Sequence, residues 1–252
     1  MTTKAKITLV GAGPGAIDLI TLKGVQVLQN AKVVLYDALV NKELLNYAKD
    51  AVLVPVGKRG GKPSASQSRI NQLLLSYALI YGDVVRLKGG DPFIFGRGLE
   101  EVEFAQRNGV ETEVVPGISS STGLTATKGI SLTQRGIANG FWVLTATKQK
   151  GKWNEDLSLA AQSNSTIVVL MGVGKLPQIV REFKTAGKST LPVMIIQNGS
   201  LPNEKVVRGT VSSIQQLAKE NEIAAPAIIV LGETLRNQSN NQLKSELFKQ
   251  LN

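Results

Sequence analysis

The amino-acid sequence predicts an α/β protein made of two lobes, each a sheet flanked by helices. The first observation is that short β-rich runs alternate with longer amphipathic stretches along the first half, which is typical of strands covered by helices. The second is that this alternation restarts after a stretch rich in Gly, Ser and Thr. The third is that 42% of the 252 residues are hydrophobic, enough to bury a proper core.

The elements of the first half follow from the type and period of their residues. The expected strands are short apolar runs, and the expected helices are longer and carry apolar residues on one face. Strands are expected at residues 7–10, 32–37, 51–56, 83–88 and 112–116, and helices at residues 21–31, 42–50, 68–82 and 100–109. Alternation of this kind predicts a parallel sheet covered by helices.

The second half is a second α/β unit rather than a tail. Apolar runs bounded by Gly, Asn and Pro occur at residues 141–146, 165–174, 192–200 and 226–233, with further stretches at 175–187 and 206–221. Residues 117–130, GISSSTGLTATKGI, have no clear period and are expected to connect the lobes. The predicted boundaries are a first lobe over 1–117, a second over 118–236 and a polar tail over 237–252.

The residue types that are missing exclude whole classes of chemistry. The sequence contains neither cysteine nor histidine. Disulfides, thiolate nucleophiles, Ser-His-Asp triads and nearly every zinc or haem site are therefore excluded, and no metal site is expected. Any catalytic acid or base must be Asp, Glu, Lys or Tyr, with Arg as a fixed positive charge.

The charge balance favours an anionic partner. The 29 basic and 19 acidic residues give a net charge of +10, which suits nucleic acid, an anionic membrane or a small molecule with many carboxylates or phosphates. A solvated basic surface is an equally good explanation. Aromatic residues are only 5% of the chain, which argues against a stacking platform for single-stranded nucleic acid. We find no membrane span or secretory signal in the sequence and expect a cytoplasmic protein.

Residues 7–22, ITLVGAGPGAIDLITL, place three glycines directly after an expected strand. They match a loose dinucleotide fingerprint, in which the glycines open into a helix that faces a pyrophosphate and an acidic residue, here Asp37, follows. Two features count against this interpretation, since Pro14 lies inside the loop and the helix is expected to begin only after its cap, Thr21. A tight turn after a buried strand is the simpler alternative.

Residues 84–101, VVRLKGGDPFIFGRGLEE, are more unusual. An apolar strand ends in Gly89-Gly90-Asp91, where a ligand can lie against the bare main chain and Asp91 can accept hydrogen bonds from hydroxyl or amine groups. A turn that caps the next helix is the alternative. The continuation FIFGRG, with two Phe and an Arg among glycines, is hard to explain by capping alone.

These segments resemble the uroporphyrinogen-III C-methyltransferases of the tetrapyrrole methylase superfamily. The matching segments run in family order from residue 7 to 233: GAGPG, VVLYDALV, VGKRGGK, SQSRINQLL, VVRLKGGDPFIFGRGLEE, VVPGISSS, ISLTQRG, VVLMGVGKL and PAIIVLGE. The resemblance implies a class III S-adenosylmethionine-dependent methyltransferase, usually a homodimer, with the cofactor in the cleft between two α/β lobes. It would methylate uroporphyrinogen III at C2 and C7, giving precorrin-2 for siroheme or cobalamin and releasing S-adenosylhomocysteine.

The resemblance also assigns roles to individual residues. By motif, the cofactor contacts are Pro14, Gly89, Gly90, Asp91, Ile94, Ser119, Ser120, Met171, Gly199 and Ala227. Asp37 matches the family's proposed base and Lys58 its proposed proton donor; capping of the next helix is the alternative for Asp37. The basic residues Arg59, Lys62, Arg97 and Arg135 suit the eight carboxylates of the substrate.

The sequence departs from the family pattern at several positions. The family commonly has Asp where Ala16 stands, Glu where Arg69 stands, and His in the segments that here read KPSAS, LTQRG and TATKQ. A precorrin methyltransferase acting later in cobalamin synthesis is an alternative within the same enzyme class. An RNA methylase or RNA-binding protein that uses the +10 charge is an alternative of another class.

Overall fold

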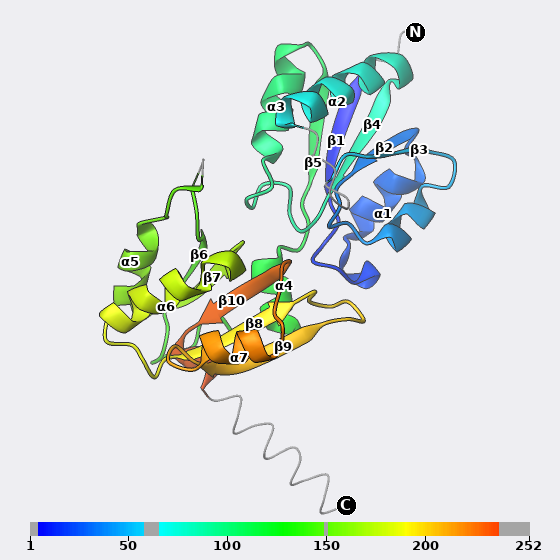
Figure 1. The fold of residues 1–252 in the computed structure, drawn as a ribbon. Coiled ribbons are helices and arrows are strands. Elements are labelled where there is room, and N and C mark those ends of the chain that lie inside the picture. Colours follow the sequence, from blue (N-terminus) through cyan, green and yellow to red (C-terminus); the bar gives the residue numbers. More distant parts are fainter. Residues whose placement is uncertain (1–4, 58–65, 149–150, 237–252) are drawn as a thin grey trace, which may run out of the picture. The chain divides into compact units, whose positions relative to one another are not determined.

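The computed structural model describes residues 5–57, 66–148 and 151–236 (Figure 1). The chain divides into two compact units, Met1–Ser120 and Ser121–Asn252, which are described separately. Lys58, Arg59, Lys62 and the predicted tail lie outside the described residues. Among the described helices, none is long and apolar enough to cross a membrane.

The sheet of the first unit is parallel throughout, as the alternation predicts. Its strands are β1 (Lys6–Gly11), β2 (Val33–Tyr36), β3 (Val52–Pro55), β4 (Asp83–Lys88) and β5 (Glu111–Val115). Their order is β3-β2-β4-β1-β5, with every pair parallel. The interior strands β1 and β4 are buried on both faces; β1 is almost continuously apolar, whereas β4 also carries the buried charges of Arg86 and Lys88.

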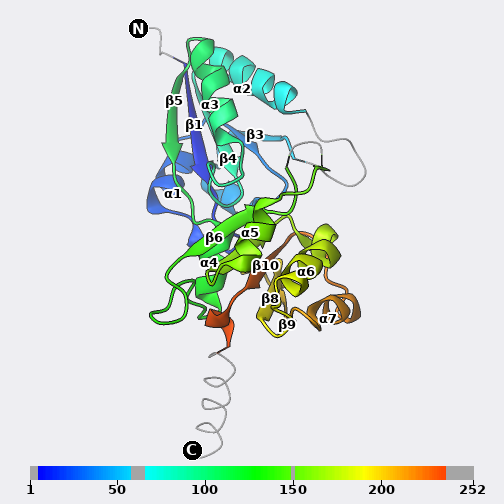
Figure 2. The same cartoon turned by 90° about the vertical axis from the view of Figure 1, so that its left-hand side faces the viewer.

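Helices cover both faces of this sheet (Figure 2). They are α1 (Leu22–Gln29), α2 (Gln67–Tyr81) and α3 (Gly98–Arg107), with 3-10 turns η1 (Ile17–Leu19) and η2 (Lys42–Tyr47). One core cluster packs α2 and α3 on the sheet, and a second packs α1 and η2 on the opposite face. Thr21 caps α1 by accepting a hydrogen bond from the Gly24 N–H at 3.1 Å, which confirms the predicted helix start.

The second unit holds a mixed sheet. Its strands are β6 (Phe141–Thr145), β7 (Thr166–Leu170), β8 (Pro192–Gln197), β9 (Lys205–Thr210) and β10 (Ala227–Leu231), in the order β6-β7-β10-β8-β9. Only β6 and β7 pair in parallel; β10 runs antiparallel to both β7 and β8, and β9 runs antiparallel to β8. The predicted second α/β unit is confirmed.

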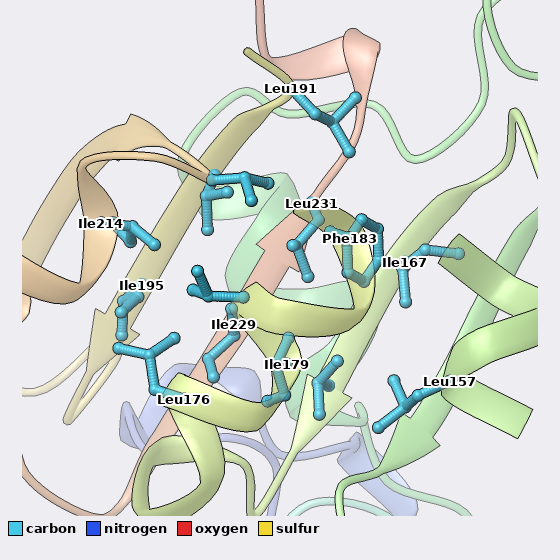
Figure 3. Packing of buried hydrophobic residues seen from close by; sticks show 14 of the residues in the cluster. Leu157, Ile167, Leu176, Ile179, Phe183, Leu191, Ile195, Ile214, Ile229 and Leu231 are labelled. Carbon is cyan, nitrogen blue, oxygen red and sulfur yellow. The ribbon is translucent and has the colours of Figure 1, made fainter. Parts of the chain in front are cut away.

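The helices of the second unit also lie on two faces. They are α4 (Ser120–Thr127), α5 (Asp156–Gln162), α6 (Leu176–Thr185) and α7 (Ile214–Glu220), with 3-10 turns η4 (Val173–Lys175) and η5 (Glu233–Leu235). Figure 3 shows Ile179 and Phe183 of α6 packed on Ile229 and Leu231 of β10, in the cluster that also buries α5 and α7. On the other face, Leu124 of α4 joins a separate cluster.

Helix α4 was not expected from the sequence, which indicated an irregular connection at residues 117–130. Its sequence, SSTGLTAT, has poor helix formers and no apolar stripe. Burial of small residues and of Leu124 stabilises it instead, and the Thr125 hydroxyl donates to the Ser121 and Thr122 carbonyls at 3.2 and 2.9 Å. Tertiary packing therefore overrides local propensity here.

Candidate active site

Three loops of the first unit leave the carboxyl ends of neighbouring strands. They follow β4, β1 and β5, which are adjacent in the sheet. The helix after β1 packs on one face and the helix after β4 packs on the other, so the direction of winding reverses between these two strands. In open α/β sheets, ligands bind outside the carboxyl ends of the strands at such a reversal.

Backbone groups join the GAGPG loop to the Gly89-Gly90-Asp91 turn. The Gly13 N–H donates to the Gly90 carbonyl at 3.2 Å, and the Gly90 N–H donates to the Gly13 carbonyl at 2.7 Å. Both residues have positive φ, 77° and 68°, which favours glycine. The two stretches that the sequence singled out therefore form one continuous piece of main chain.

The third loop, which follows β5, packs closely against the other two loops at Gly117. A Cβ at Gly117 would lie 2.3 Å from the Gly90 carbonyl oxygen and 2.6 Å from the Gly11 Cα. Asp91 adds a side-chain link, because its Oδ1 accepts from the Phe93 N–H at 2.8 Å and its Oδ2 accepts from the Gly117 N–H at 3.0 Å. The Asp91 carboxylate thus holds the loops together.

We expect Gly117→Ala to lower the free energy of unfolding by about 1–3 kcal/mol, as overpacking in a tightly packed site does. The added methyl group would overlap the backbone of two other loops, which cannot move as a flexible side chain can. Urea unfolding would measure this. Gly174→Ala is the control, since a Cβ there meets nothing within 4 Å. Equal stability of the two variants would contradict the interlocked arrangement.

The segment between Asp91 and α3 combines backbone strain with exposed apolar side chains. Phe95 and Arg97 have φ of 53° and 58°, which is costly for residues with a Cβ. The exposed apolar side chains are Phe93, Ile94 and Phe95, with Leu99 following in the first turn of α3. Because α3 begins only at Gly98, Asp91 does not cap it, and the interpretation of the turn as a helix cap is wrong.

The structure gathers the predicted cofactor residues of the first unit at this edge of the sheet. These residues are Pro14, Gly89, Gly90, Asp91, Ile94, Ser119 and Ser120. A Cβ placed on Gly90 would have one described atom within 4 Å, the backbone nitrogen of Ser120 at 3.9 Å. A bare backbone with open space above it, as far as the described residues show, suits close approach by a ligand.

Asp37 follows β2 at the same edge of the sheet. Its Oδ1 accepts a hydrogen bond from Arg86 Nη2 at 2.5 Å, and no described residue donates to its Oδ2. The interpretation of Asp37 as a helix cap is wrong, because Asn41 caps η2 by accepting from the Glu43 N–H at 3.0 Å. Asn41 also donates to the Gly15 carbonyl at 3.0 Å, which ties this loop to the GAGPG loop.

A buried ionic network lies beneath Asp37. Arg86, Lys88 and Glu101 are 2%, 3% and 2% exposed. Arg86 Nε donates to Glu101 Oε1 at 3.0 Å, and Lys88 Nζ lies 3.0 Å from Glu101 Oε2. Burial opposes the charge on Arg86, but Glu101 and Asp37 together raise the pKa of its guanidinium. Burial and then repulsion from Arg86 lower the pKa of Lys88, despite the attraction of both carboxylates.

The lowered pKa of Lys88 predicts a pH dependence of stability. Between the folded-state pKa and the unfolded value near 10.5, the unfolded chain binds more protons, so stability rises with pH in that window. Lys88→Met removes this contribution. We would measure the free energy of unfolding of both proteins by urea titration at several pH values. The wild-type value minus the variant value should grow from neutral pH to pH ~10, since groups that titrate alike in both proteins cancel in this difference. A constant or shrinking difference would contradict the assignment.

Three of the predicted residues, Lys58, Arg59 and Lys62, cannot be placed because they lie outside the described residues. Gly57, which directly precedes them, packs against the loop that carries Asp37. A Cβ at Gly57 would lie 2.1 Å from the backbone nitrogen of Ala38, the next residue after Asp37. The chain therefore passes beside Asp37 as it enters this segment.

The other two predicted substrate residues lie in different units. Arg97 is about half exposed and makes a bidentate ion pair with Glu100. Its Nε donates to Glu100 Oε1 at 2.8 Å and its Nη2 donates to Glu100 Oε2 at 2.6 Å. Arg135 lies exposed in the second unit, in a loop closed by a bridge between Gln134 and Ala138. Each guanidinium is accessible to solvent, as binding of a carboxylate requires.

The strand order of the second unit gathers its three predicted cofactor residues at one edge. Strands β7 and β8 flank the antiparallel β10, so Met171 and Gly199, just beyond their ends, lie beside Ala227 at the start of β10. Met171 is 66% exposed with φ of 53°. A buried gap-filling methionine, the simpler interpretation of this residue type, is excluded by that exposure.

Sequence reasoning missed Arg86, Lys88, Glu101 and Asn41. A signal existed for the first two, because VVRLK places two cations at alternate positions of an expected strand in a parallel sheet, whose strands are buried on both faces. A charge at such a position must be paired. The sequence could not identify the partners, which lie 15 and 49 residues away from Arg86.

Comparison with known proteins shows the family of this chain. The family described as Tetrapyrrole (Corrin/Porphyrin) Methylases matches residues 6–215. A uroporphyrinogen-III C-methyltransferase of Methanocaldococcus jannaschii is 43% identical over 91% of this chain and 96% of its own length. A siroheme synthase of Actinobacillus pleuropneumoniae is 46% identical over 92% of this chain, which spans only 48% of that longer protein.

The solved structures include a uroporphyrin-III C-methyl transferase from Thermus thermophilus complexed with S-adenyl homocysteine. It is 41% identical, with a TM-score of 0.79 over 92% of this chain and 99% of that one. The family match and the long, highly identical relatives agree with the two α/β units and the glycine-bridged loops. The chain belongs to the tetrapyrrole methylase family.

Proposed function

We propose that this protein transfers methyl groups from S-adenosylmethionine to C2 and C7 of uroporphyrinogen III, giving precorrin-2 and S-adenosylhomocysteine. The observation that carries the proposal is the 43% identity, over almost the full length of both chains, to a protein named for this reaction. The S-adenyl homocysteine in the Thermus thermophilus structure supports the choice of cofactor.

The first unit presents a surface that fits such a cofactor. Gly13 and Gly90 offer main chain without side chains, and a Cβ at Gly90 would enter otherwise open space within the described part of the unit. We assign the remaining contacts as the sequence predicts, from Pro14, Ile94 and the serines of the third loop, with Met171, Gly199 and Ala227 in the second unit. When bound, the cofactor supplies an electrophilic methyl group on a sulfonium sulfur.

Asp37 is the proposed base. Methylation of a pyrrole carbon must be followed by loss of a proton from the macrocycle, and a carboxylate held at the edge of the site can accept it. Oδ1 is held by Arg86 and Oδ2 is free to take the proton, as far as the described residues show. Lys58 is the proposed proton donor.

The net charge of +10 supports a substrate with eight carboxylates. We assign their binding to Arg59, Lys62, Arg97 and Arg135. We further propose that the protein acts as a cytoplasmic homodimer, as the family resemblance implies. Light scattering of the purified protein would measure its mass, and a monomer at micromolar concentration would contradict the dimer.

The reaction itself is the decisive test. Purified protein incubated with labelled S-adenosylmethionine and uroporphyrinogen III should give a product that absorbs as a dihydrosirohydrochlorin and carries two labelled methyl groups. No incorporation would disprove the proposal. Mass spectrometry with a panel of tetrapyrroles would identify a later precorrin methyltransferase, and tight binding to RNA that falls steeply with salt would favour the RNA alternative.

Calorimetry tests the cofactor separately. We expect S-adenosylhomocysteine to bind and NAD to give no binding signal, because α1 begins beyond η1 and does not present its N-terminus directly behind the glycine loop. NAD binding that competes with S-adenosylhomocysteine would restore the dinucleotide interpretation of GAGPG.

A further inference from the structure

The buried carboxylate of Glu101 has no role in the reaction proposed above. It lies in the first turn of α3, and its side chain is inaccessible to solvent. It pairs with Arg86 and Lys88 and accepts a hydrogen bond from Gln67 Nε2 at 3.1 Å. Burying a carboxylate is costly, so a surface position would serve better if Glu101 only stabilised α3.

The contacts of Arg86 show what Glu101 can control. The guanidinium donates through Nε to Glu101, through Nη2 to Asp37, and through Nη1 to the Leu35 and Leu87 carbonyls at 3.5 and 3.3 Å. A guanidinium is planar and rigid, so a contact that fixes Nε also fixes the direction of Nη2. Glu101 therefore sets the orientation of the group that holds Asp37 Oδ1.

The charges of the network support the same conclusion. Two cations, Arg86 and Lys88, face two carboxylates, and Glu101 is the one that contacts both cations. Its Oε2 accepts no hydrogen bond among the described residues and is balanced by the Lys88 ammonium alone. Without Glu101, Arg86 would have Asp37 as its only counter-ion among the described residues and would lose its anchor at Nε.

We propose that Glu101 is a positioning residue that acts through Arg86 to hold the Asp37 carboxylate in place, with Oδ2 left free to accept the proton. The inference rests on the proposed function for the role of Asp37, but the Arg86 contact on which it depends can be tested without substrate.

The first experiment follows the Arg86 guanidinium by NMR of the ¹⁵N-labelled protein. We expect separate Nη signals in the wild type, because hydrogen bonds restrict rotation about the Nε–Cζ bond, and averaged signals in Glu101→Gln, whose neutral amide holds the guanidinium more weakly than the carboxylate does. Glu103→Gln is the matched control, an exposed glutamate on the same helix, and should leave the spectrum unchanged. Unchanged restriction in Glu101→Gln would overturn the proposal even if the protein did not methylate uroporphyrinogen III.

The second experiment is a double-mutant cycle with Asp37→Asn. Glu101→Gln alone should lower kcat by up to about 100-fold, the scale of a misplaced catalytic group, with the Kd for S-adenosylhomocysteine and the KM for the tetrapyrrole unchanged. In the Asp37→Asn protein the same change should have little further effect, because the base is already absent. Equal effects in both backgrounds would overturn the proposal.

A charge-balanced variant guards against misfolding of Glu101→Gln. The double change Lys88→Met and Glu101→Gln removes one charge of each sign and leaves the charges of Arg86 and Asp37 balanced. It should fold with little loss of melting temperature and should still show the lowered kcat and the averaged Arg86 signals. A wild-type kcat in this variant would mean that Glu101 has only a structural role.

Discussion

Asp37→Asn should reduce the rate of methyl transfer to uroporphyrinogen III by about 10²–10⁴-fold, the usual contribution of a positioned general base. The amide keeps the size of the side chain and can still accept a hydrogen bond from Arg86, but it cannot take up the proton that leaves the macrocycle. The rate is measured as labelled methyl incorporation under single-turnover conditions.

The cofactor affinity of this variant separates catalysis from binding. Asp37 follows β2, whereas the bridged glycine loops follow β1 and β4, so the Kd for S-adenosylhomocysteine should stay within a few-fold of wild type. Asp50→Asn, an exposed carboxylate in the same unit, is the matched control and should retain the full rate. A full rate in Asp37→Asn would remove Asp37 from the mechanism.

Arg86→Met should lower the free energy of unfolding by about 3–5 kcal/mol, the cost of removing one partner from a buried ion pair. The change leaves the Glu101 carboxylate buried with Lys88 as its only ionic partner in the described structure, and it leaves Asp37 without its ion pair. Urea unfolding measures the loss. Arg107→Met, an exposed arginine at the end of α3, should change stability by no more than about 0.5 kcal/mol.

A second substitution shows where the loss comes from. Adding Glu101→Gln to Arg86→Met leaves the buried Lys88 without the carboxylate that it contacts and should lower the stability further, because an unpaired buried ion is costly. If the double variant is as stable as Arg86→Met, the loss instead reflects packing of the Arg86 side chain.

The backbone part of the candidate site could be predicted well from the sequence. Glycine is the residue that tolerates positive φ and backbone contact, so GAGPG and GGD indicated where main chain is exposed or crowded. The sequence did not show that Gly13 and Gly90 bond to each other, because that contact depends on the order of β1 and β4 in the sheet.

The side-chain part was predicted less well. Asp91 was expected to face a ligand, but both its oxygens accept backbone N–H groups. For Asp37 the residue pattern alone left base and helix cap equally open, and the family resemblance favoured the base. The structure excludes the cap because Asn41 fills that place. Local sequence gives the chemistry of a side chain but not its partners, which are supplied by distant strands and helices.

By itself, the sequence determined the α/β class, the two units, the positions of the glycine turns and, through its lack of Cys and His, the limits on the chemistry. Periodicity, turn residues and composition are local properties that a chain carries before it folds. Only the tertiary structure decided the strand order, the helix α4 and the network of Arg86, Lys88, Glu101 and Asp37. Those features depend on burial, and burial brings together residues that are far apart along the chain.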